Sequence, residues 1–274
     1  MILRDNFVNL LEKSKLSNLN NKYTDYINSL SNNLNEMPNI ILYGPSAVGK
    51  YSEALKIIEK YSPSNLKYEK KIIINSSKNE HILKISDIHY EIDLENLTCN
   101  SKILFNDIYN NIIDVIQSSK LKIGIILCKN FHKINNEILE NFYSYMQKNL
   151  ISNIILKFIL ITEHLSFIPN NIQDICKTLY YSKLSYSNYI KLSNNNNKKF
   201  LLNKQKCELD KNNMDFLSNI SSINLLKYVD IDNSNQNILN IKSSICDKIV
   251  GIIFSNNINY NNIRHILYDI LIYN

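Results

Sequence analysis

Glycine is scarce in this sequence. Four glycines occur among 274 residues, and two of them, Gly44 and Gly49, lie five positions apart. Glycine readily adopts the backbone conformations of tight turns and lets a backbone approach a ligand closely. Because so few glycines are present, their pairing within the single heptapeptide GPSAVGK is hard to attribute to chance. This segment is therefore the first candidate for a functional loop.

Long hydrophobic runs are also missing. The chain is 45% hydrophobic and 20% charged, as is typical of a globular protein. No segment approaches the roughly 18 apolar residues of a membrane-spanning helix, and the longest run, Ile154 to Ile161, is interrupted by Lys157. Residues 1–15 carry scattered charges without an apolar core, which argues against a secretory signal. We therefore expect an intracellular protein with no membrane association.

Paired cysteines are missing as well. Five cysteines are widely spaced and form no CxxC pair, which argues against a disulfide framework and a zinc site. The five histidines have no metal-ligand spacing either, so no metal site is expected. We expect the cysteines to be buried free thiols. They are Cys99, Cys128, Cys176, Cys207 and Cys246. The net charge of +6 is spread along the chain and by itself identifies no partner.

The GPSAVGK segment lies between a short apolar run, Asn39 to Tyr43, and an amphipathic stretch, Ser52 to Lys60. This order of strand, glycine-rich loop and helix predicts a phosphate-binding P-loop, in which backbone amides surround phosphate oxygens and Lys50 contacts the terminal phosphates. The candidate nucleotide-binding residues are Gly44, Pro45, Ser46, Ala47, Val48, Gly49, Lys50 and Tyr51.

Tyr51 stands where a P-loop normally has the Ser or Thr hydroxyl that holds magnesium. Its phenol is too long and too far displaced for that role. We therefore expect weak binding of ATP or ADP without hydrolysis, and no bound metal.

Strand and helix patterns alternate after the loop, which predicts an α/β fold with a parallel sheet and crossover helices. Strands are expected at 71–74, 83–94, 123–128 and 156–162, and helices at 106–117 and 135–147. From about Ser185 the pattern becomes polar and helical, and apolar-faced helices are expected at 238–253 and 260–271. The predicted domains are 1–183, a P-loop α/β domain; 184–231, a helical lid; and 232–274, a short helical region.

In its ordered motifs the chain resembles the small subunits of replication factor C, the AAA+ clamp loader, and among them the non-catalytic type. The resemblance covers about Asn39 to Ser185. It includes the LYGPS-GK loop, the strand pair 83–86 and 88–93, the strand and helix at 124–147, and the segments 158–164 and 172–176. The resemblance implies an AAA+-like P-loop domain followed by a lid and a truncated collar.

The chain departs from this family at the catalytic positions. The two Walker B acids fall on Lys129 and Asn130, the sensor-1 residue on Glu163, and the arginine finger on Ile175. The sensor-2 arginine, expected near 221–224, is also missing. The arginine pair that faces DNA in the family falls on Tyr143 and Ser144. For Tyr143 and Tyr145, which stand beside Phe142 and Met146, core packing is a simpler interpretation than base stacking. Without carboxylates to hold metal and activate water, phosphoryl transfer is not expected.

A subunit that helps load a sliding clamp onto primed DNA, while its neighbours hydrolyse ATP, agrees best with a retained scaffold and lost catalytic groups. The implied partners are other clamp-loader subunits, the sliding clamp and primer-template DNA, and the implied location is the nucleus or a viral replication site. The Asn-rich composition is typical of an AT-rich genome, such as that of a large DNA virus. Two alternatives are an ATP-using P-loop enzyme (a nucleotide kinase or a DNA-repair ATPase) and a monomeric relic with an interaction role.

Overall fold

The computed structural model of the protein describes residues 6–17, 23–76, 79–97, 101–147, 154–183, 241–254 and 260–273. The helices are α1 (Phe7–Ser17), α2 (Thr24–Ser29), α3 (Lys50–Glu59), α4 (Ser101–Ser118), α5 (Asn136–Gln147), α6 (Asn170–Asp174), α9 (Ile241–Phe254) and α10 (Tyr260–Tyr273). The strands are β1 (Asn39–Tyr43), β2 (Lys70–Ser76), β3 (Asn79–Ile85), β4 (His89–Asp93), β5 (Ile123–Lys129), β6 (Ile155–Thr162) and β7 (Cys176–Tyr180). Short 3-10 helices are η2 (Leu34–Glu36), η3 (Leu94–Asn96) and η4 (Phe131–Lys133).

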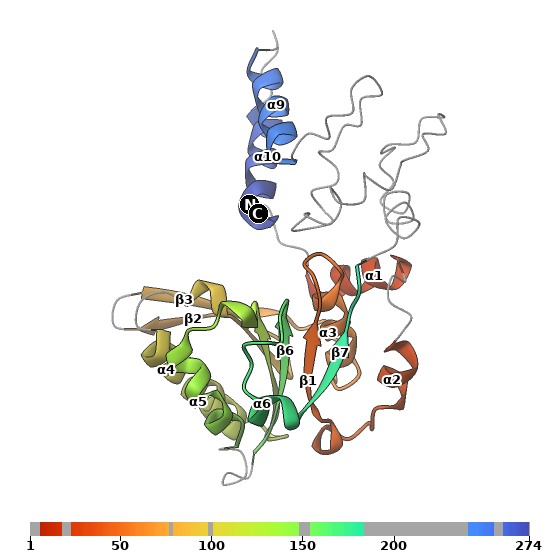
Figure 1. Ribbon diagram of the computed structural model, residues 1–274, viewed down its shortest axis with the longest axis vertical. Helices are drawn as coiled ribbons and strands as arrows, with labels where there is room; N and C mark the ends of the chain where they lie inside the picture. Colours follow the sequence, from red (N-terminus) through yellow and green to blue (C-terminus); the bar gives the residue numbers. More distant parts are fainter. Residues whose placement is uncertain are drawn as a thin grey trace. The chain divides into compact units, whose positions relative to one another are not determined.

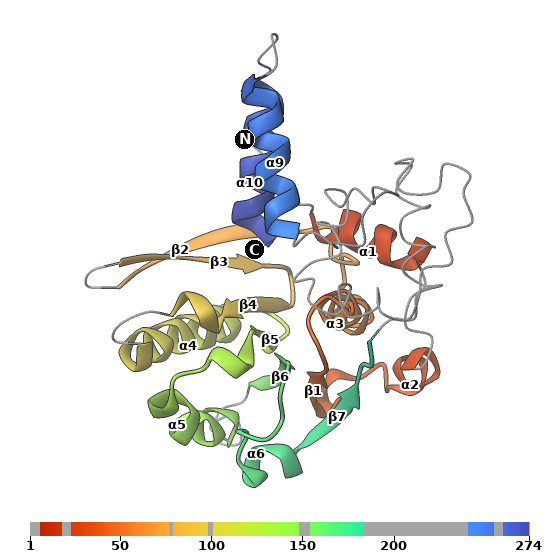
Figure 2. The ribbon, with the colours of Figure 1, turned by 45° about the horizontal axis from the view of Figure 1, so that its top comes forward.

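The described strands form one seven-stranded sheet in the order β2-β3-β4-β5-β6-β1-β7. Strands β6, β1 and β7 lie side by side in Figure 1, and Figure 2 labels all the strands. The five strands from β4 to β7 are parallel, and β1 lies between β6 and β7, with Leu42 paired to Ile161 and Leu179. Parallel neighbours need crossover connections, which α4, α5 and α6 supply in turn. The chain therefore places β6 on one side of β1 and then β7 on the other.

Helices cover both faces of the parallel part of the sheet. Helices α4 and α5 lie on one face, and α3 lies on the other with α1 against it (Figure 2). This follows from the connections, because the chain crosses from β1 to β4 in one direction and returns through β5 and β6 in the opposite direction. Right-handed crossovers then place the helices on opposite faces.

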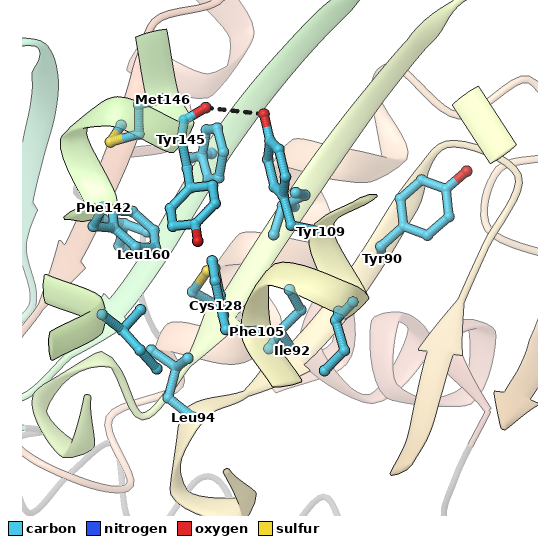
Figure 3. Close-up of a cluster of buried hydrophobic side chains, with 14 of the residues drawn as sticks. Tyr90, Ile92, Leu94, Phe105, Tyr109, Cys128, Phe142, Tyr145, Met146 and Leu160 are labelled. Atoms are coloured by element: carbon cyan, nitrogen blue, oxygen red, sulfur yellow. Dashed lines mark hydrogen bonds between the residues drawn. The ribbon is translucent and has the colours of Figure 1, made fainter. Parts of the chain in front are cut away.

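A cluster of buried side chains forms the main core of the described residues, between the sheet and α4 and α5 (Figure 3). Phe105 of α4 packs against Phe142 and Tyr145 of α5, with ring centroids 5.9 and 5.2 Å apart. Tyr109 contacts the same group and donates a hydrogen bond from its hydroxyl to the backbone oxygen of Tyr145, 3.1 Å away. Tyr145 is buried and Tyr143 is half-buried against the cluster, so the core-packing interpretation of this helix is confirmed.

The predicted α/β fold is confirmed, with three differences. The helix after the loop begins at Lys50, earlier than predicted, because Gly49 in a left-handed conformation serves as its N-cap. The stretch 83–94, predicted from its alternation as one strand, contains the end of β3 and all of β4, which are antiparallel, so the strand pair implied by the resemblance is confirmed. The sheet is therefore mixed, with the β2–β3 hairpin at its edge.

Helices α1, α2 and α6 and the edge strand β7 were not predicted from the sequence. In α1, buried Phe7 and Leu11 share one face, and the charges around them hid this short pattern. In β7 the apolar alternation is weak, since Leu179 alone is fully buried. Pairing with β1 makes this segment a strand, and that pairing is a tertiary contact.

The chain divides into two compact units: residues 5–45 with 49–182, and residues 1–4, 46–48 and 183–274. In the C-terminal part, α9 and α10 correspond to the helices predicted at 238–253 and 260–271. The predicted lid at 184–231 lies outside the described residues, so the division into a domain, a lid and a collar stays a prediction. Among the helices that the structure describes, none is long and apolar enough to cross a membrane.

Three of the five cysteines lie in described segments, and their thiols are free. Cys128 is buried in β5, where burial raises its pKa, and Cys176 is partly buried with its pKa raised to about 12 for the same reason. Cys246 is exposed on α9, so the prediction of a buried thiol is wrong there. Cys99 and Cys207 lie outside the described residues.

Candidate nucleotide-binding site

The loop between β1 and α3 has the backbone conformation that its glycines require. Gly44 and Gly49 have φ angles of 150° and 87°, and Ala47 between them has a φ of 57°. A Cβ atom on Gly44 would lie 2.1 Å from the backbone oxygen of Tyr181, so no larger residue fits there. Gly44 is thus required because the backbone of Tyr181 passes close to it. The sequence alone predicts only the close approach of a phosphate.

Lys50 begins α3 and turns back over the loop. Its side chain is buried, and its ammonium donates hydrogen bonds to the backbone oxygens of Gly44 and Pro45, the latter 2.7 Å away. Burial lowers the pKa of Lys50 to about 8, against the opposing effect of the Glu163 charge. An ammonium held over a loop at a helix N-terminus favours an anion there. The other predicted loop residues, Pro45 to Val48, lie between these two ends.

Tyr51 points away from the loop and towards β4. Its hydroxyl donates a 2.6 Å hydrogen bond to Oε1 of Glu91, in the middle of that strand. Glu91 is almost completely buried, with 3% of its surface exposed. The residue in the predicted magnesium position is therefore one end of a buried polar cluster.

Lys129 provides the positive charge of this cluster. Its ammonium lies 3.4 Å from Oε2 of Glu91 and 3.7 Å from Oδ2 of Asp93, and 5.7 Å from the ring centroid of Tyr51. His89 Nε2 lies 3.6 Å from Oε1 of Glu91, beyond hydrogen-bond distance, so its effect on this carboxylate is electrostatic. Burial alone would raise the pKa of Glu91, but His89, Lys129 and the Tyr51 hydroxyl together lower it well below its usual range. Glu91 is therefore a buried carboxylate that stays ionised.

Asn130 occupies the second predicted Walker B position, in a left-handed conformation with a φ of 51°. Its side-chain amide donates to Oδ1 of Asp93 at 2.9 Å and to Oε2 of Glu95 at 3.2 Å. Of the residues at the Walker B positions, Lys129 thus forms ion pairs with carboxylates of β4, and Asn130 donates hydrogen bonds to carboxylates of β4 and η3. Glu91 and Asp93 were missed as site residues, because the alternation at 88–94 places them on the polar side of a strand. Both faces of this strand are in fact covered, since His89 and Glu91 are buried as well as Tyr90 and Ile92.

The loop after β6 brings further charges towards Lys50. Glu163, at the predicted sensor-1 position, affects the pKa of both Lys50 and His132. The rings of His132 and His164 are 6.2 Å apart, and Nδ1 of His132 is buried without a hydrogen-bond partner. Burial lowers the pKa of His132, and the nearby Lys133, Lys50 and His164 charges act in the same direction. The neutral form of this imidazole is therefore favoured.

The residues here do not fit a magnesium ion. Mg²⁺ requires oxygen ligands in near-octahedral geometry. Glu91 is contacted by Tyr51 and Lys129, and Asp93 by Lys129 and Asn130. In the part of the chain that the structure describes, no group of three or more His, Cys, Asp or Glu side chains is arranged to hold a metal ion.

The predicted arginine-finger segment also lacks a positive group. Asp174 ends α6, Ile175 is its C-cap, and Cys176 begins β7. This stretch therefore packs as a helix-to-strand connection, with Ile175 against the main core cluster.

No protein-family model matches the sequence. No curated protein matches it either. Among solved structures, a single-residue variant of RuvB from Thermotoga maritima aligns with a TM-score of 0.42 at 12% identity, covering 92% of this chain and 68% of that chain. A chain of the HORMA:CdnC:Trip13 complex from E. coli MS115-1 aligns with a TM-score of 0.42 at 11% identity, covering 96% and 84%. The T. maritima RuvB Holliday junction branch migration motor gives a TM-score of 0.38 at 12% identity, covering 95% and 68%. These likenesses are distant, and the α/β P-loop fold of this chain rests on its sheet order and its strand, loop and helix.

Proposed function

We propose that this chain is an AAA+ subunit of a replication factor C-like clamp loader that binds ATP or ADP weakly without hydrolysing it. It helps to load a sliding clamp onto primed DNA, and its neighbours in the ring hydrolyse ATP. The observation that carries this proposal is the contrast at the start of α3. The loop from Gly44 to Lys50 keeps its turns and its buried ammonium, whereas Tyr51 and Lys129 are engaged with Glu91.

Binding can outlast catalysis because the two depend on different groups. Loop amides and Lys50 contact phosphate in the ground state as well as in the transition state. A metal ion and a base that activates water contribute mainly in the transition state. In this chain Lys129 and Asn130 stand where the carboxylates that hold metal and activate water are expected. We therefore expect a subunit that binds nucleotide and does not hydrolyse it.

The partners of such a subunit are other clamp-loader subunits, the sliding clamp, and primer-template DNA through the assembled complex. Its place of action is the nucleus or a viral replication site. The test is to express the full chain with the small clamp-loader subunits encoded in the same genome and to separate the mixture by size exclusion. A stable complex that loads a clamp onto primed DNA, and loses this activity without the chain, supports the proposal. A chain that elutes alone as a monomer contradicts it.

Phosphate release distinguishes this proposal from an ATP-using P-loop enzyme. We expect no turnover by the isolated chain, and measurable equilibrium binding of ATP and ADP that Lys50→Ala weakens. Turnover at an ordinary enzymatic rate that Lys50→Ala abolishes would identify an enzyme, in which groups outside the expected positions supply the chemistry.

A further inference from the structure

The two edges of the seven-stranded sheet differ in what lies against them. At the β7 edge, the hydroxyl of Tyr23 accepts a 3.0 Å hydrogen bond from the backbone N–H of Tyr180. The ammonium of Lys177, also in β7, lies 5.9 Å from the ring centroid of Tyr26 in α2. At the opposite edge, β2 pairs with β3, and no described strand pairs with its outer side (Figure 2). A strand in this position presents a row of backbone groups that can pair with another chain.

Contacts on its inner side hold β2 in an extended conformation. All of its residues, Lys70 to Ser76, are in antiparallel register with β3. Just before the strand, Oε2 of Glu69 accepts a 2.8 Å hydrogen bond from the backbone N–H of Phe7, and Oε1 lies 2.9 Å from the ammonium of Lys84. Because the strand is already ordered, little conformational entropy would be lost when a further strand pairs with it.

The centre of β2 carries an apolar side chain that the sheet does not cover. Ile73 is 55% exposed, whereas its neighbour Ile72 packs against the main core cluster. Edge strands are commonly protected from pairing by charged side chains. In β2 the charged residues are Lys70 and Lys71, both exposed and both at the beginning of the strand. The rest of β2 has no such protection in its sequence.

From this arrangement we propose that β2 is a docking surface for a second copy of this chain, with the two β2 strands antiparallel about a twofold axis at Ile73. In that register Ile73 lies opposite Ile73 of the second copy, and Ile72 lies opposite Ile74. The two lysines lie opposite Asn75 and Ser76, so the lysines of the two copies stay apart. Opposed β-branched residues stabilise an antiparallel pair and opposed like charges destabilise it, so the order of residues in β2 favours pairing with itself.

The test is the oligomeric state of the full chain, followed by sedimentation velocity as the concentration rises. Pairing of two single strands buries little surface, so we expect a reversible dimer with a dissociation constant on the order of 10–100 µM. This expectation does not depend on nucleotide binding. A chain that stays monomeric well above that range overturns the inference, and assigns the β2 edge to another part of the chain or to a different protein.

A charge at the centre of β2 should disrupt the dimer. We expect Ile73→Lys to weaken dimerisation by about tenfold or more, because two lysines would then lie opposite each other. The matched control is Leu121→Lys, which places the same charge at a side chain that is 61% exposed between α4 and β5, and which should leave the dimer unchanged. Circular dichroism establishes that both variants are folded. A dimer that Ile73→Lys does not weaken overturns the inference.

Cysteine cross-linking tests the register without relying on that variant. In Ile73→Cys, the opposed Cα atoms of an antiparallel pair are about 4.5–5.5 Å apart, so oxidised glutathione should produce an intermolecular disulfide. In Lys71→Cys the two new cysteines are four positions out of register, about 13 Å apart along the strands, and should not be joined. Peptide mass spectrometry distinguishes these bonds from those of the native cysteines. A dimer that is not cross-linked in Ile73→Cys, or that is cross-linked in Lys71→Cys, overturns the proposed pairing.

Discussion

The candidate site has two halves that meet at the start of α3, and they differ in how closely their residues match a P-loop that binds nucleotide and metal. The phosphate half, Gly44 to Lys50, has left-handed turns and a lysine folded over the loop. The metal half, where Tyr51 and Lys129 replace a hydroxyl and a carboxylate, is a buried network around Glu91. Phosphate binding and metal binding depend on different groups of a P-loop, and here the backbone turns of the first are present while the side chains at the positions of the second contact Glu91.

The contacts around Glu91 also indicate how the fold accommodates charged groups in the metal half of the site. A lone buried carboxylate is costly, and so is a lone buried ammonium. Here Glu91 and Lys129 compensate each other, and Tyr51 and Asn130 add hydrogen bonds to Glu91 and Asp93. The network is therefore expected to contribute to stability, which the following substitutions test.

The largest effect is expected in the phosphate half, for Gly44→Ala. The new methyl group would meet the backbone oxygen of Tyr181 at 2.1 Å, at a φ of 150° that alanine rarely adopts. We expect the free energy of unfolding to fall by about 3 kcal/mol or more. Denaturant unfolding of the full chain measures this change.

Gly251→Ala is the matched control for that substitution. Nothing lies within 4 Å of a Cβ atom at this position in α9. Alanine in a helix interior is favoured over glycine by roughly 0.5–1 kcal/mol, so a neutral or slightly stabilising effect is expected. Equal effects of the two substitutions would show that Gly44 is not constrained by Tyr181.

In the metal half we expect Glu91→Gln to lower the free energy of unfolding by about 3 kcal/mol at neutral pH, because it leaves Lys129 with a weaker partner. Glu95→Gln removes an exposed carboxylate that contacts Asn130 and should change stability by less than about 0.5 kcal/mol. Urea unfolding of both variants and the wild type measures the difference.

The difference in unfolding free energy between the wild type and Glu91→Gln should depend on pH in one direction. The pKa of Glu91 is lower in the folded protein than its ordinary value of 4.5, so the folded state favours the ionised form. The stabilising contribution is complete above about pH 4.5 and is lost as the pH falls towards the folded pKa. The wild type should therefore approach Glu91→Gln in stability below that pH, and a constant gap down to pH 3 would contradict the buried ion pair.

Nucleotide binding should weaken as the pH rises above about 8, the pKa to which burial lowers Lys50. Phosphate favours the charged lysine, and between pH 8 and 9 the free protein loses most of that charge. The expected loss of affinity between pH 7 and 9 is roughly tenfold, since one pKa unit corresponds to about a tenfold change. Equilibrium titrations with ADP at several pH values measure it.

Lys50→Arg is the control for this titration, because the guanidinium stays charged throughout the range. Its affinity, whatever its value at pH 7, should be constant to pH 9. A wild-type affinity that is equally constant would show that the Lys50 charge does not contribute to binding.

Apart from the control substitutions, the smallest effect is expected for Tyr51→Phe. This change removes one hydrogen bond to Glu91 and leaves the ring and the Lys129 contact in place. We expect a loss of stability of about 1 kcal/mol and no gain of ATP hydrolysis. Thermal unfolding and phosphate release measure the two outcomes, and a gain of turnover would mean that the Tyr51 hydroxyl had been blocking an otherwise competent site.

The parallel strands and their crossover helices could be predicted because each has its own periodic pattern. Strand β1 occurs with the bounds predicted for it, and helices α4 and α5 differ from their predicted bounds at their ends. The edge strand β7 and the helix α1 could not be predicted, because β7 is defined by pairing and α1 by a short buried face. The lid and the clamp-loader role stay predictions.

The sequence by itself determined the phosphate half. Two glycines five residues apart, between a strand and a helix, require a particular local backbone, and Lys50 follows within the same segment. The sequence also determined that no carboxylate stands at Lys129 and Asn130. Only the tertiary structure decided what stands there instead, because Tyr51 and Glu91 are 40 residues apart and meet through the packing of α3 on the sheet. The register of β4 against β5 then brings Lys129 beside Asp93. Local periodicity reports which face of a strand a residue occupies, but whether that face is covered, and by which charge, depends on segments distant in the chain.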